Sequence, residues 1–129
     1  MRIVVTDAAT VVGDGVTLDF LQSFGEVTAY DVTAPAELAE RIAPAEILLC
    51  NKTVIPAEAM DAAPGLRFIG VFATGYNNID LEAASAREIV VCNVPGYSTE
   101  AVAQHTFALL LALLNRVGEY TRTVAAGDW

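Results

Sequence analysis

The sequence is poor in basic residues and contains no long apolar run. Seven Lys and Arg residues stand against sixteen Asp and Glu residues, which gives a net charge of -9. Proteins that bind nucleic acid or anionic membranes need clustered positive charge, so we expect neither partner. The longest uninterrupted apolar run, residues 107–114, has eight residues, whereas a membrane-spanning helix needs about 20. We therefore expect no membrane anchor.

Cysteine and histidine are also scarce. Cys50 and Cys92 end two separate apolar runs without CxxC spacing, so we expect buried, reduced thiols rather than a disulfide or a metal site. His105, the only histidine, has no acidic or cysteine partner on its helical face. We expect it to pack or to cap its helix rather than to catalyse or bind a metal. Neither GxGxxG nor GxxxxGK[ST] occurs, so the sequence has no recognisable dinucleotide or P-loop motif.

Apolar residues, by contrast, are abundant. The hydrophobic fraction is 54% and the charged fraction 18%, which is typical of a folded chain, and 129 residues fit one domain. The N-terminus, MRIVVTDAAT, enters a strand-like run without the charged start and cleavage site of a signal peptide. We therefore expect a cytoplasmic protein.

Short runs rich in Val, Ile and Leu recur along the first three quarters of the chain. Three of them are continuously apolar, as parallel strands covered on both faces are, so we expect one parallel sheet. The predicted strands are residues 2–7, 26–31, 46–51, 67–73 and 88–93. Helical patterns lie between them: residues 16–24 closed by Gly25, 34–42 with Pro35 near the start, 56–62, and 81–88 with Asp80 as N-cap.

This alternation of strands and helices predicts an α/β fold with a doubly wound parallel five-stranded sheet. In such folds ligands bind at the carboxyl ends of the strands. Polar residues at those ends are therefore the candidates for function: Asp7, residues 51–53, residues 74–78 and residues 93–97.

A longer helix breaks the rhythm of the chain. Ser98 or Thr99 can begin it and Gly118 can close it, which predicts about 19 residues over 99–117, or about 28 Å. It is apolar on nearly every side. We therefore expect it to be covered by polypeptide that this chain lacks.

Two loops at the predicted sheet edge carry candidate anion ligands. Gly75 can take a positive φ, so that the amides of Thr74 and Gly75 form a cradle for a small carboxylate. The alternative is a plain turn with Asp80 as a helix cap. Asn51 and Lys52 follow the third strand, where Lys52 can fix an anionic substrate and Asn51 can orient an oxygen. The alternative there is a solvated lysine.

A third loop connects the fifth strand to the long helix. Pro95 and Gly96 predict a turn that redirects the chain. It serves either as a hinge, with Asn93 and Tyr97 at the sheet edge, or as a plain connection with Tyr97 packed on the core.

Three stretches resemble a known family: CNKTVIP, GVFATGYNNIDLEAA and NVPGYSTEAVAQHTFALLLALLNR. They are similar to the N-terminal third of the D-isomer-specific 2-hydroxyacid dehydrogenases, nearest to the bacterial glycerate dehydrogenase (hydroxypyruvate reductase) branch. The resemblance implies a flavodoxin-like substrate (catalytic) domain over residues 1–97. Residues 98–129 would be the crossover helix and the start of an NAD-binding domain whose remainder is absent. It also implies a homodimer through the 99–117 helix.

The resemblance also assigns roles to individual residues. Thr74 and Gly75 would hold the substrate carboxylate, Asn51 and Lys52 would border the substrate, and Asn93 and Tyr97 would lie at the domain cleft. The start of the long helix would approach the nicotinamide of the coenzyme through Thr99, Val102 and Gln104.

The implied reaction is hydride transfer between NAD, or NADP, and a small 2-keto or 2-hydroxy acid. The family's catalytic Arg, Glu and His lie beyond this chain, so no catalytic residue and no metal are assigned to it. We expect the 129-residue chain alone to be inactive and to bind the coenzyme weakly.

Two other interpretations belong to different classes of protein. One is a stand-alone flavodoxin-like binding or signalling module without catalysis, such as a receiver domain. A receiver needs acidic residues after the first and third strands and a Lys after the fifth, and only Asp7 fits, because Asn51 and Asn93 fill the other positions. The other is a truncated domain that serves only as a structural unit.

Overall fold

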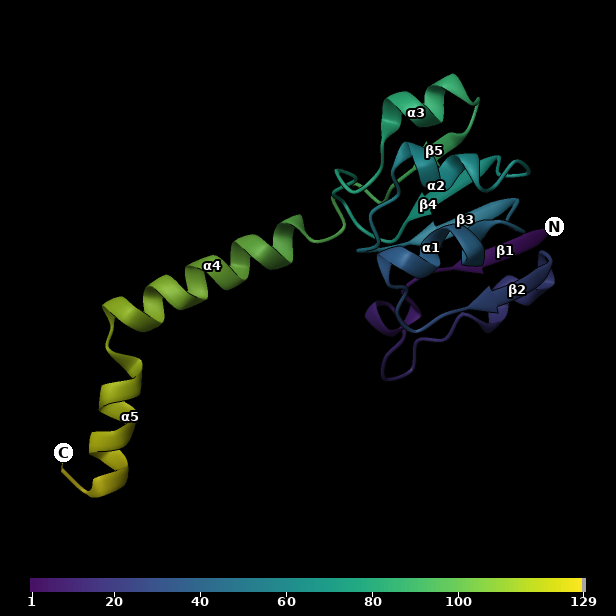
Figure 1. Cartoon of the computed structure of the whole chain (residues 1–129). Helices are drawn as coiled ribbons and strands as arrows, with labels where there is room; N and C mark the ends of the chain where they lie inside the picture. Colours follow the sequence, from purple (N-terminus) through teal and green to yellow (C-terminus); the bar gives the residue numbers. More distant parts are fainter. Residues whose placement is uncertain (129) are drawn as a thin grey trace. The chain divides into compact units, whose positions relative to one another are not determined.

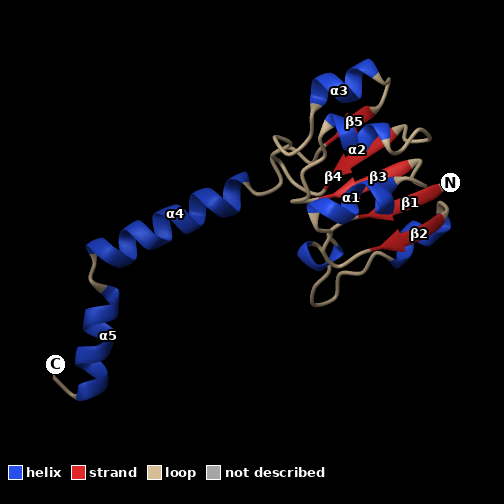
Figure 2. Cartoon of the chain, viewed as in Figure 1, coloured by secondary structure: helices blue, strands red, loops and turns tan. Residues whose placement is uncertain are grey.

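The structure, a computed structural model, describes residues 1–128 and contains two compact units (Figures 1 and 2). The first unit, Met1–Pro95, holds a parallel sheet with the strand order β2-β1-β3-β4-β5. The five strands are β1 (Arg2–Val5), β2 (Glu26–Ala29), β3 (Ile47–Cys50), β4 (Phe68–Val71) and β5 (Val90–Cys92). This order confirms the flavodoxin-like fold. Each strand is shorter than predicted, because residues at the ends of the predicted segments belong to turns and loops.

One face of the sheet carries the larger core. It is covered by α1 (Pro35–Ile42), α2 (Ala57–Asp61) and α3 (Leu81–Ala86), three predicted helices that the structure confirms. Leu48 and Ile69 are fully buried on this face, together with Ile42 of α1. Alternate residues of the same strands point to the other face, which is why the strands are apolar throughout.

The helix starts follow from the sequence. Pro35 is the first residue of α1, where its missing N–H is not needed. The Glu37 carboxylate accepts the Ala34 amide at 3.0 Å and so satisfies a backbone donor before the helix. At α3 the Asp80 carboxylate accepts the Ala83 amide at 2.9 Å, which confirms the predicted cap.

The predicted helix over residues 16–24 is wrong. Two short 3₁₀ segments occupy this connection, η1 (Ala8–Thr10) and η2 (Asp19–Ser23). Gly15 takes a φ of 81°, and Gly13 bridges to Val16, so the chain turns just before the segment could start a helix. Leu21 is the only buried residue of η2. A segment this short with one buried residue cannot repay the cost of helix nucleation.

The second face of the sheet therefore has a smaller core. Leu21 packs there with Ile3, Val5 and Leu49 of the central strands. Within residues 1–128 no α-helix contributes to this cluster of buried residues.

The second unit begins at Gly96 and contains α4 (Thr99–Leu114) and α5 (Val117–Ala126). The predicted end of the long helix at Gly118 is wrong, because α4 already stops at Leu114. Asn115 donates its side-chain amide to the Leu111 carbonyl at 2.9 Å, and Arg116 takes a left-handed φ of 51°. The Leu111 carbonyl accepts the Asn115 backbone amide as well, so the side-chain bond adds to the last helical bond, and the left-handed backbone at Arg116 ends the helix. Gly118 lies inside α5, which closes at Gly127 with a φ of 83°.

No residue of α4 or α5 is buried. His105 is accordingly exposed on α4, so its predicted packing is wrong. Among the described residues, no single helix is long and apolar enough to cross a membrane. Only α4 and α5 taken together reach the length and apolar composition of a membrane-spanning helix, and the two are bent by 54° at the break between them.

Candidate functional site

The carboxyl edge of the sheet is organised around Asp7, which follows β1. Asp7 is 4% exposed, and its carboxylate accepts three backbone amides from the loop after β3. The Asn51 amide lies 2.9 Å from Oδ1, and the Thr53 amide lies 2.8 Å from Oδ2. Lys52 donates the third bond. Because hydrogen bonds to a carboxylate are stronger than neutral ones, Asp7 fixes the backbone on which Asn51 and Lys52 stand.

Asn78 joins the loops after β3 and β4. Its side-chain amide donates to the Thr53 carbonyl at 2.8 Å, and its own carbonyl accepts the Ile55 amide at 2.8 Å. Sequence reasoning placed Asp7 and Asn78 at the sheet edge but did not predict the hydrogen bonds that either makes. For Asp7 the available signal was a carboxylate next to a buried strand, which requires partners when it is itself buried, whereas half-buried Asn78 offered no such signal.

The Thr74–Gly75 segment is tethered to the loop after β5. Asn93 donates its side-chain amide to the Thr74 carbonyl at 2.7 Å, and the Thr74 hydroxyl donates to the Val94 carbonyl at 3.1 Å. Both residues of the segment are exposed. Within residues 1–128 neither backbone amide donates a hydrogen bond. The segment therefore presents two open donors on a backbone held by side chains from the neighbouring loop.

One detail of the predicted cradle is wrong. Gly75 does not have a positive φ; within residues 1–128 that conformation occurs at Gly15, Gly96 and Gly127 among the glycines. A Cβ atom at position 75 would lie 3.4 Å from the Asn77 side-chain oxygen, which is close to ordinary contact. The amides are thus available without left-handed backbone. The positive φ occurs instead at Gly96, where it makes the predicted Pro95–Gly96 turn.

The structure gives Asn51 and Lys52 different surroundings. The Asn51 side-chain amide donates to the Thr10 hydroxyl at 2.9 Å, so it is already engaged with the loop after β1. Lys52 is exposed and lines a cavity of about 450 Å³ with residues at the start of α1. The two residues are adjacent in sequence but contact different parts of the sheet edge.

The remaining predicted residues belong to the second unit. Tyr97 is 67% exposed, and Val102 on α4 is 60% exposed. Thr99 and Gln104 are also exposed on α4. The candidate site is therefore built from the first unit alone, and the roles of these four residues stay predictions.

The two cysteines are free thiols with different exposure. Cys50 is buried at the end of β3, as predicted, and burial raises its pKa to about 12, helped by the negative charge of Asp7. Cys92 is exposed, so its predicted burial is wrong. The reason is that β5 is an edge strand with neither face fully covered. Among residues 1–128, no three His, Cys, Asp or Glu side chains lie close enough together to hold a metal ion.

These features suit anion binding better than proton transfer. The first unit contains no histidine, and Asp7 is occupied by three amides. Two open backbone N–H groups on a tethered loop can donate charge-assisted hydrogen bonds to a small carboxylate. The occupied Asp7 also removes the one residue that fitted a receiver domain.

The comparisons with known proteins agree with this fold. Residues 3–126 match the family described as D-isomer specific 2-hydroxyacid dehydrogenase, catalytic domain. A hydroxypyruvate reductase from Blautia hydrogenotrophica is 38% identical over 132 residues, covering 100% of this chain and 41% of that protein. The chain thus spans about two fifths of the length of this relative.

Two solved structures illustrate the likeness. One, of a protein from Thermus thermophilus, has a TM-score of 0.78 at 38% identity, covering 100% of this chain and 42% of that chain. The other is an NADPH-dependent glyoxylate/hydroxypyruvate reductase from Sinorhizobium meliloti in complex with NADP and malonate. It has a TM-score of 0.72 at 28% identity, covering 99% of this chain and 39% of that chain.

Proposed function

Because the chain belongs to the D-isomer specific 2-hydroxyacid dehydrogenase family, we propose that it is the substrate-binding part of an NAD- or NADP-dependent oxidoreductase. Its reaction interconverts a small 2-keto acid and the corresponding D-2-hydroxy acid. The two open amides of the Thr74–Gly75 segment carry this proposal. We propose hydroxypyruvate or glyoxylate as the substrate, since relatives are named for reducing these acids.

The segment suits the carboxylate of a 2-keto acid. A carboxylate accepts two N–H donors at once, and such bonds are about twice as strong as neutral ones. The bonds from Asn93 and to Val94 hold the segment in place before the substrate arrives. A tethered loop loses little entropy on binding, so more of the interaction energy appears as affinity.

The coenzyme would need residues outside this chain. The sequence has no glycine-rich turn for a dinucleotide pyrophosphate, so these residues do not fit that group by themselves, and no step of the reaction is assigned to it. Thr99, Val102 and Gln104 remain the residues proposed to approach the nicotinamide in the whole enzyme. A homodimer through the long helix, now divided into α4 and α5, is likewise proposed for the whole enzyme.

Amide NMR titration of the chain with glyoxylate tests the carboxylate site. We expect saturable shifts at the amides of Thr74 and Gly75. Gly75→Pro removes one donor, whereas Gly75→Ala keeps it in a space that accepts a Cβ. Binding should weaken by about tenfold or more in the proline variant, as expected for the loss of a charge-assisted bond, and stay near wild type in the alanine variant. Equal affinities in the two variants would refute the role of the Gly75 amide.

A chimera tests the reaction itself. Residues 1–129 would replace the matching 41% of the Blautia hydroxypyruvate reductase, and oxidation of NADH and NADPH by hydroxypyruvate and glyoxylate would be followed by absorbance. We expect turnover, reduced by about 100-fold in kcat/KM by Gly75→Pro but not by Gly75→Ala. A chimera that folds and binds the coenzyme but turns over neither acid would count against the proposed substrates.

A further inference from the structure

The chain forms a turn just after the Thr74–Gly75 segment. The Ile79 amide donates to the Tyr76 carbonyl at 3.1 Å and closes this turn. Asn78 lies inside the turn and is half-buried, and the Ile79 side chain is buried. The other end of the segment is held by the loop after β5. Because Tyr76 directly follows Gly75, the position of the turn helps to set the position of the segment.

The Asn78 side chain connects this turn to the loop after β3. Its Nδ2 amide donates to the Thr53 carbonyl at 2.8 Å, across a separation of 25 residues in sequence. The Thr53 amide donates to the buried Asp7 carboxylate, also at 2.8 Å. Thr53 is thus held through both its carbonyl and its amide, so the support to which Asn78 binds is itself fixed. A continuous series of hydrogen bonds therefore runs from Asp7 to the turn beside Gly75.

Backbone hydrogen bonds anchor the same turn without help from this side chain. The Ile55 amide donates to the Asn78 carbonyl at 2.8 Å, and the Asp80 amide donates to the Ile55 carbonyl at 3.1 Å. Ile55 and Ile79 form a parallel bridge, and both are buried. The bond from the Asn78 side chain is additional to these contacts. Substitution of the side chain alone should therefore leave the fold in place.

We propose that Asn78 is a positioning residue for the carboxylate site, because its side chain restricts the motion of the Thr74–Gly75 segment before a substrate binds. Asn78 does not touch the substrate and acts through the turn that begins at Tyr76. A segment held at both ends loses little conformational entropy on binding, so the loss of one restraint should weaken the affinity. The identity of the ligand rests on the proposed function, whereas the restraint on the segment is a property of the chain alone.

NMR relaxation of the backbone amides measures this restraint without any ligand. Asn78→Ala removes both N–H donors, and Asn78→Leu removes them while keeping roughly the size of the side chain. In both variants we expect the order parameters of the Thr74 and Gly75 amides to fall from about 0.85, typical of rigid backbone, toward about 0.6. Order parameters equal to those of the wild type would overturn the proposal.

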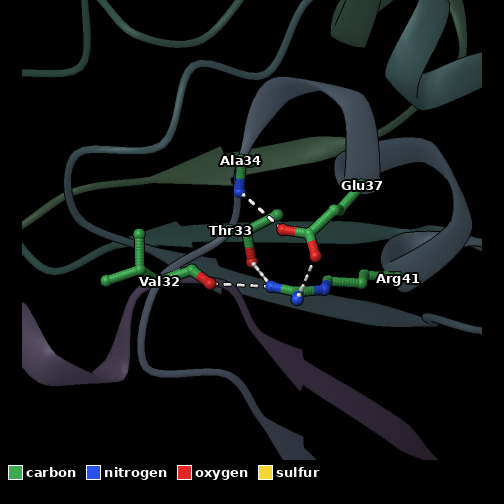
Figure 3. A network of polar contacts seen from close by, with 5 residues as sticks. All are labelled: Val32, Thr33, Ala34, Glu37 and Arg41. Carbon is green, nitrogen blue, oxygen red and sulfur yellow. Dashed lines mark hydrogen bonds and ion pairs between the residues drawn. The ribbon is translucent and has the colours of Figure 1, made fainter.

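Arg41→Ala is the control for a general loss of stability. Arg41 donates to three oxygen acceptors near the start of α1, in the network shown in Figure 3. None of these acceptors belongs to the loops after β3, β4 or β5. Arg41→Ala should therefore lower the stability of the chain and leave the motion of the Thr74–Gly75 segment unchanged. Equal loosening in Arg41→Ala and Asn78→Ala would overturn a specific role of Asn78.

Glyoxylate titration of the chain connects the restraint to binding. Asn78→Ala should weaken glyoxylate binding at the Gly75 amide by about fivefold, and Arg41→Ala should leave it unchanged. Unchanged affinity in Asn78→Ala would overturn the positioning role. A wild-type chain that binds no glyoxylate would refute the proposed substrate instead, and the order parameters would still decide whether Asn78 restrains the segment.

Kinetics of the Blautia chimera distinguish positioning from a loss of folded enzyme. Asn78→Ala should raise the KM for glyoxylate by about fivefold and leave kcat within about twofold of wild type, because the restraint acts on binding of the carboxylate before the chemical step. A smaller fraction of folded enzyme would lower kcat at an unchanged KM. That result in Asn78→Ala would overturn the proposal.

Discussion

The carboxylate of Asp7 accepts the backbone amide of Thr53 at 2.8 Å, across a separation of 46 residues in sequence. The same carboxylate binds the two preceding amides, so one buried side chain sets the course of the loop after β3. That loop carries Lys52 and one wall of the cavity that Lys52 lines. The geometry of the sheet edge therefore depends on a residue that no ligand needs to touch.

We expect Asp7→Ala to destabilise the chain strongly. It removes three charge-assisted bonds and leaves the three backbone donors without their acceptor, for a loss of about 3 kcal/mol in the free energy of unfolding. Asp7→Asn keeps one acceptor oxygen and should lose about half as much. Urea unfolding measures both, and equal stability of the wild type and Asp7→Ala would show that water replaces the carboxylate without cost.

The hydrogen bonds of Arg41 predict that its substitution lowers the stability of the chain. Arg41 stacks on the Tyr30 ring at 4.3 Å from its centroid and donates to three oxygen acceptors. Arg41→Lys keeps the charge but not the planar, multiple donors, so we expect a loss of about 1 kcal/mol, and about 2 kcal/mol for Arg41→Ala. Thermal unfolding of the two variants gives the comparison. A lysine variant as stable as wild type would mean that the charge alone suffices.

The strands and most helices were predictable because local signals and tertiary packing agree there. Ile69 and its neighbours form a continuous apolar run, and Asp80 caps α3 as its residue type suggests. The helix predicted over residues 16–24 is wrong because local signals and tertiary packing disagree there. The composition of the segment permits a helix, but the chain turns at Gly15 and only Leu21 of η2 is buried. Which residues of the segment are buried depends on its packing against the sheet, and the segment's own sequence does not specify that packing.

In the candidate site, too, some features could be predicted from the sequence and others could not. The position of Thr74 and Gly75 at the sheet edge follows from strand order, since the carboxyl ends of parallel strands meet at one edge. The bonds that hold them do not follow, because Asn93 contacts Thr74 from another loop at a distance of 19 residues in sequence. Likewise, no local pattern indicates that the left-handed backbone at Arg116 ends α4 after Leu114.

The raised pKa of the Cys50 thiol predicts that the folded chain loses stability at alkaline pH. Its pKa rises from 9.0 to about 12 in the folded chain, first because of burial and second because of Asp7. Above pH 9 the unfolded thiol releases its proton while the folded one keeps it, so the unfolded state gains stability as the pH rises toward 12. The expected loss is about 1 kcal/mol per pH unit in this window. Cys50→Ala should show a smaller slope than wild type in urea unfolding between these pH values, and parallel slopes would refute the shift.

The two cysteines should also differ in reactivity. Because the thiolate is the nucleophile, exposed Cys92 should be alkylated by iodoacetamide at mildly alkaline pH, and buried Cys50 should be protected. Mass spectrometry should find one label on the native chain and two in denaturant. Cys92→Ser provides the control and should take up no label while folded. Rapid double labelling of the native chain would mean that β3 opens readily at its end.

The chain on its own should not oxidise NADH or NADPH with hydroxypyruvate or glyoxylate. It lacks a glycine-rich pyrophosphate turn, and its first unit has no histidine to move a proton. A coupled absorbance assay at high enzyme concentration, with the chimera as the positive control, provides the measurement. Turnover by the purified 129-residue chain would contradict the expectation that catalysis needs additional polypeptide.

The apolar surface of α4 predicts self-association of the chain. Phe107 is 63% exposed and Leu111 is 54% exposed, and no residue of this helix is buried. A contiguous apolar surface of this length exceeds what soluble monomers normally expose, so a second copy should cover it. Light scattering at high micromolar concentration should give at least a dimer.

Charged substitutions on α4 locate the contact. The double variant Phe107→Glu/Leu111→Glu places two charges on one face of the helix, four residues apart, and should shift the mass to the monomer. Thr106→Glu adds one charge to another face of the same helix, at an exposed polar position, and should leave the assembly intact. A monomeric wild type would remove the basis for the proposed dimer, whereas dissociation by Thr106→Glu alone would attribute assembly to net charge rather than to the apolar surface.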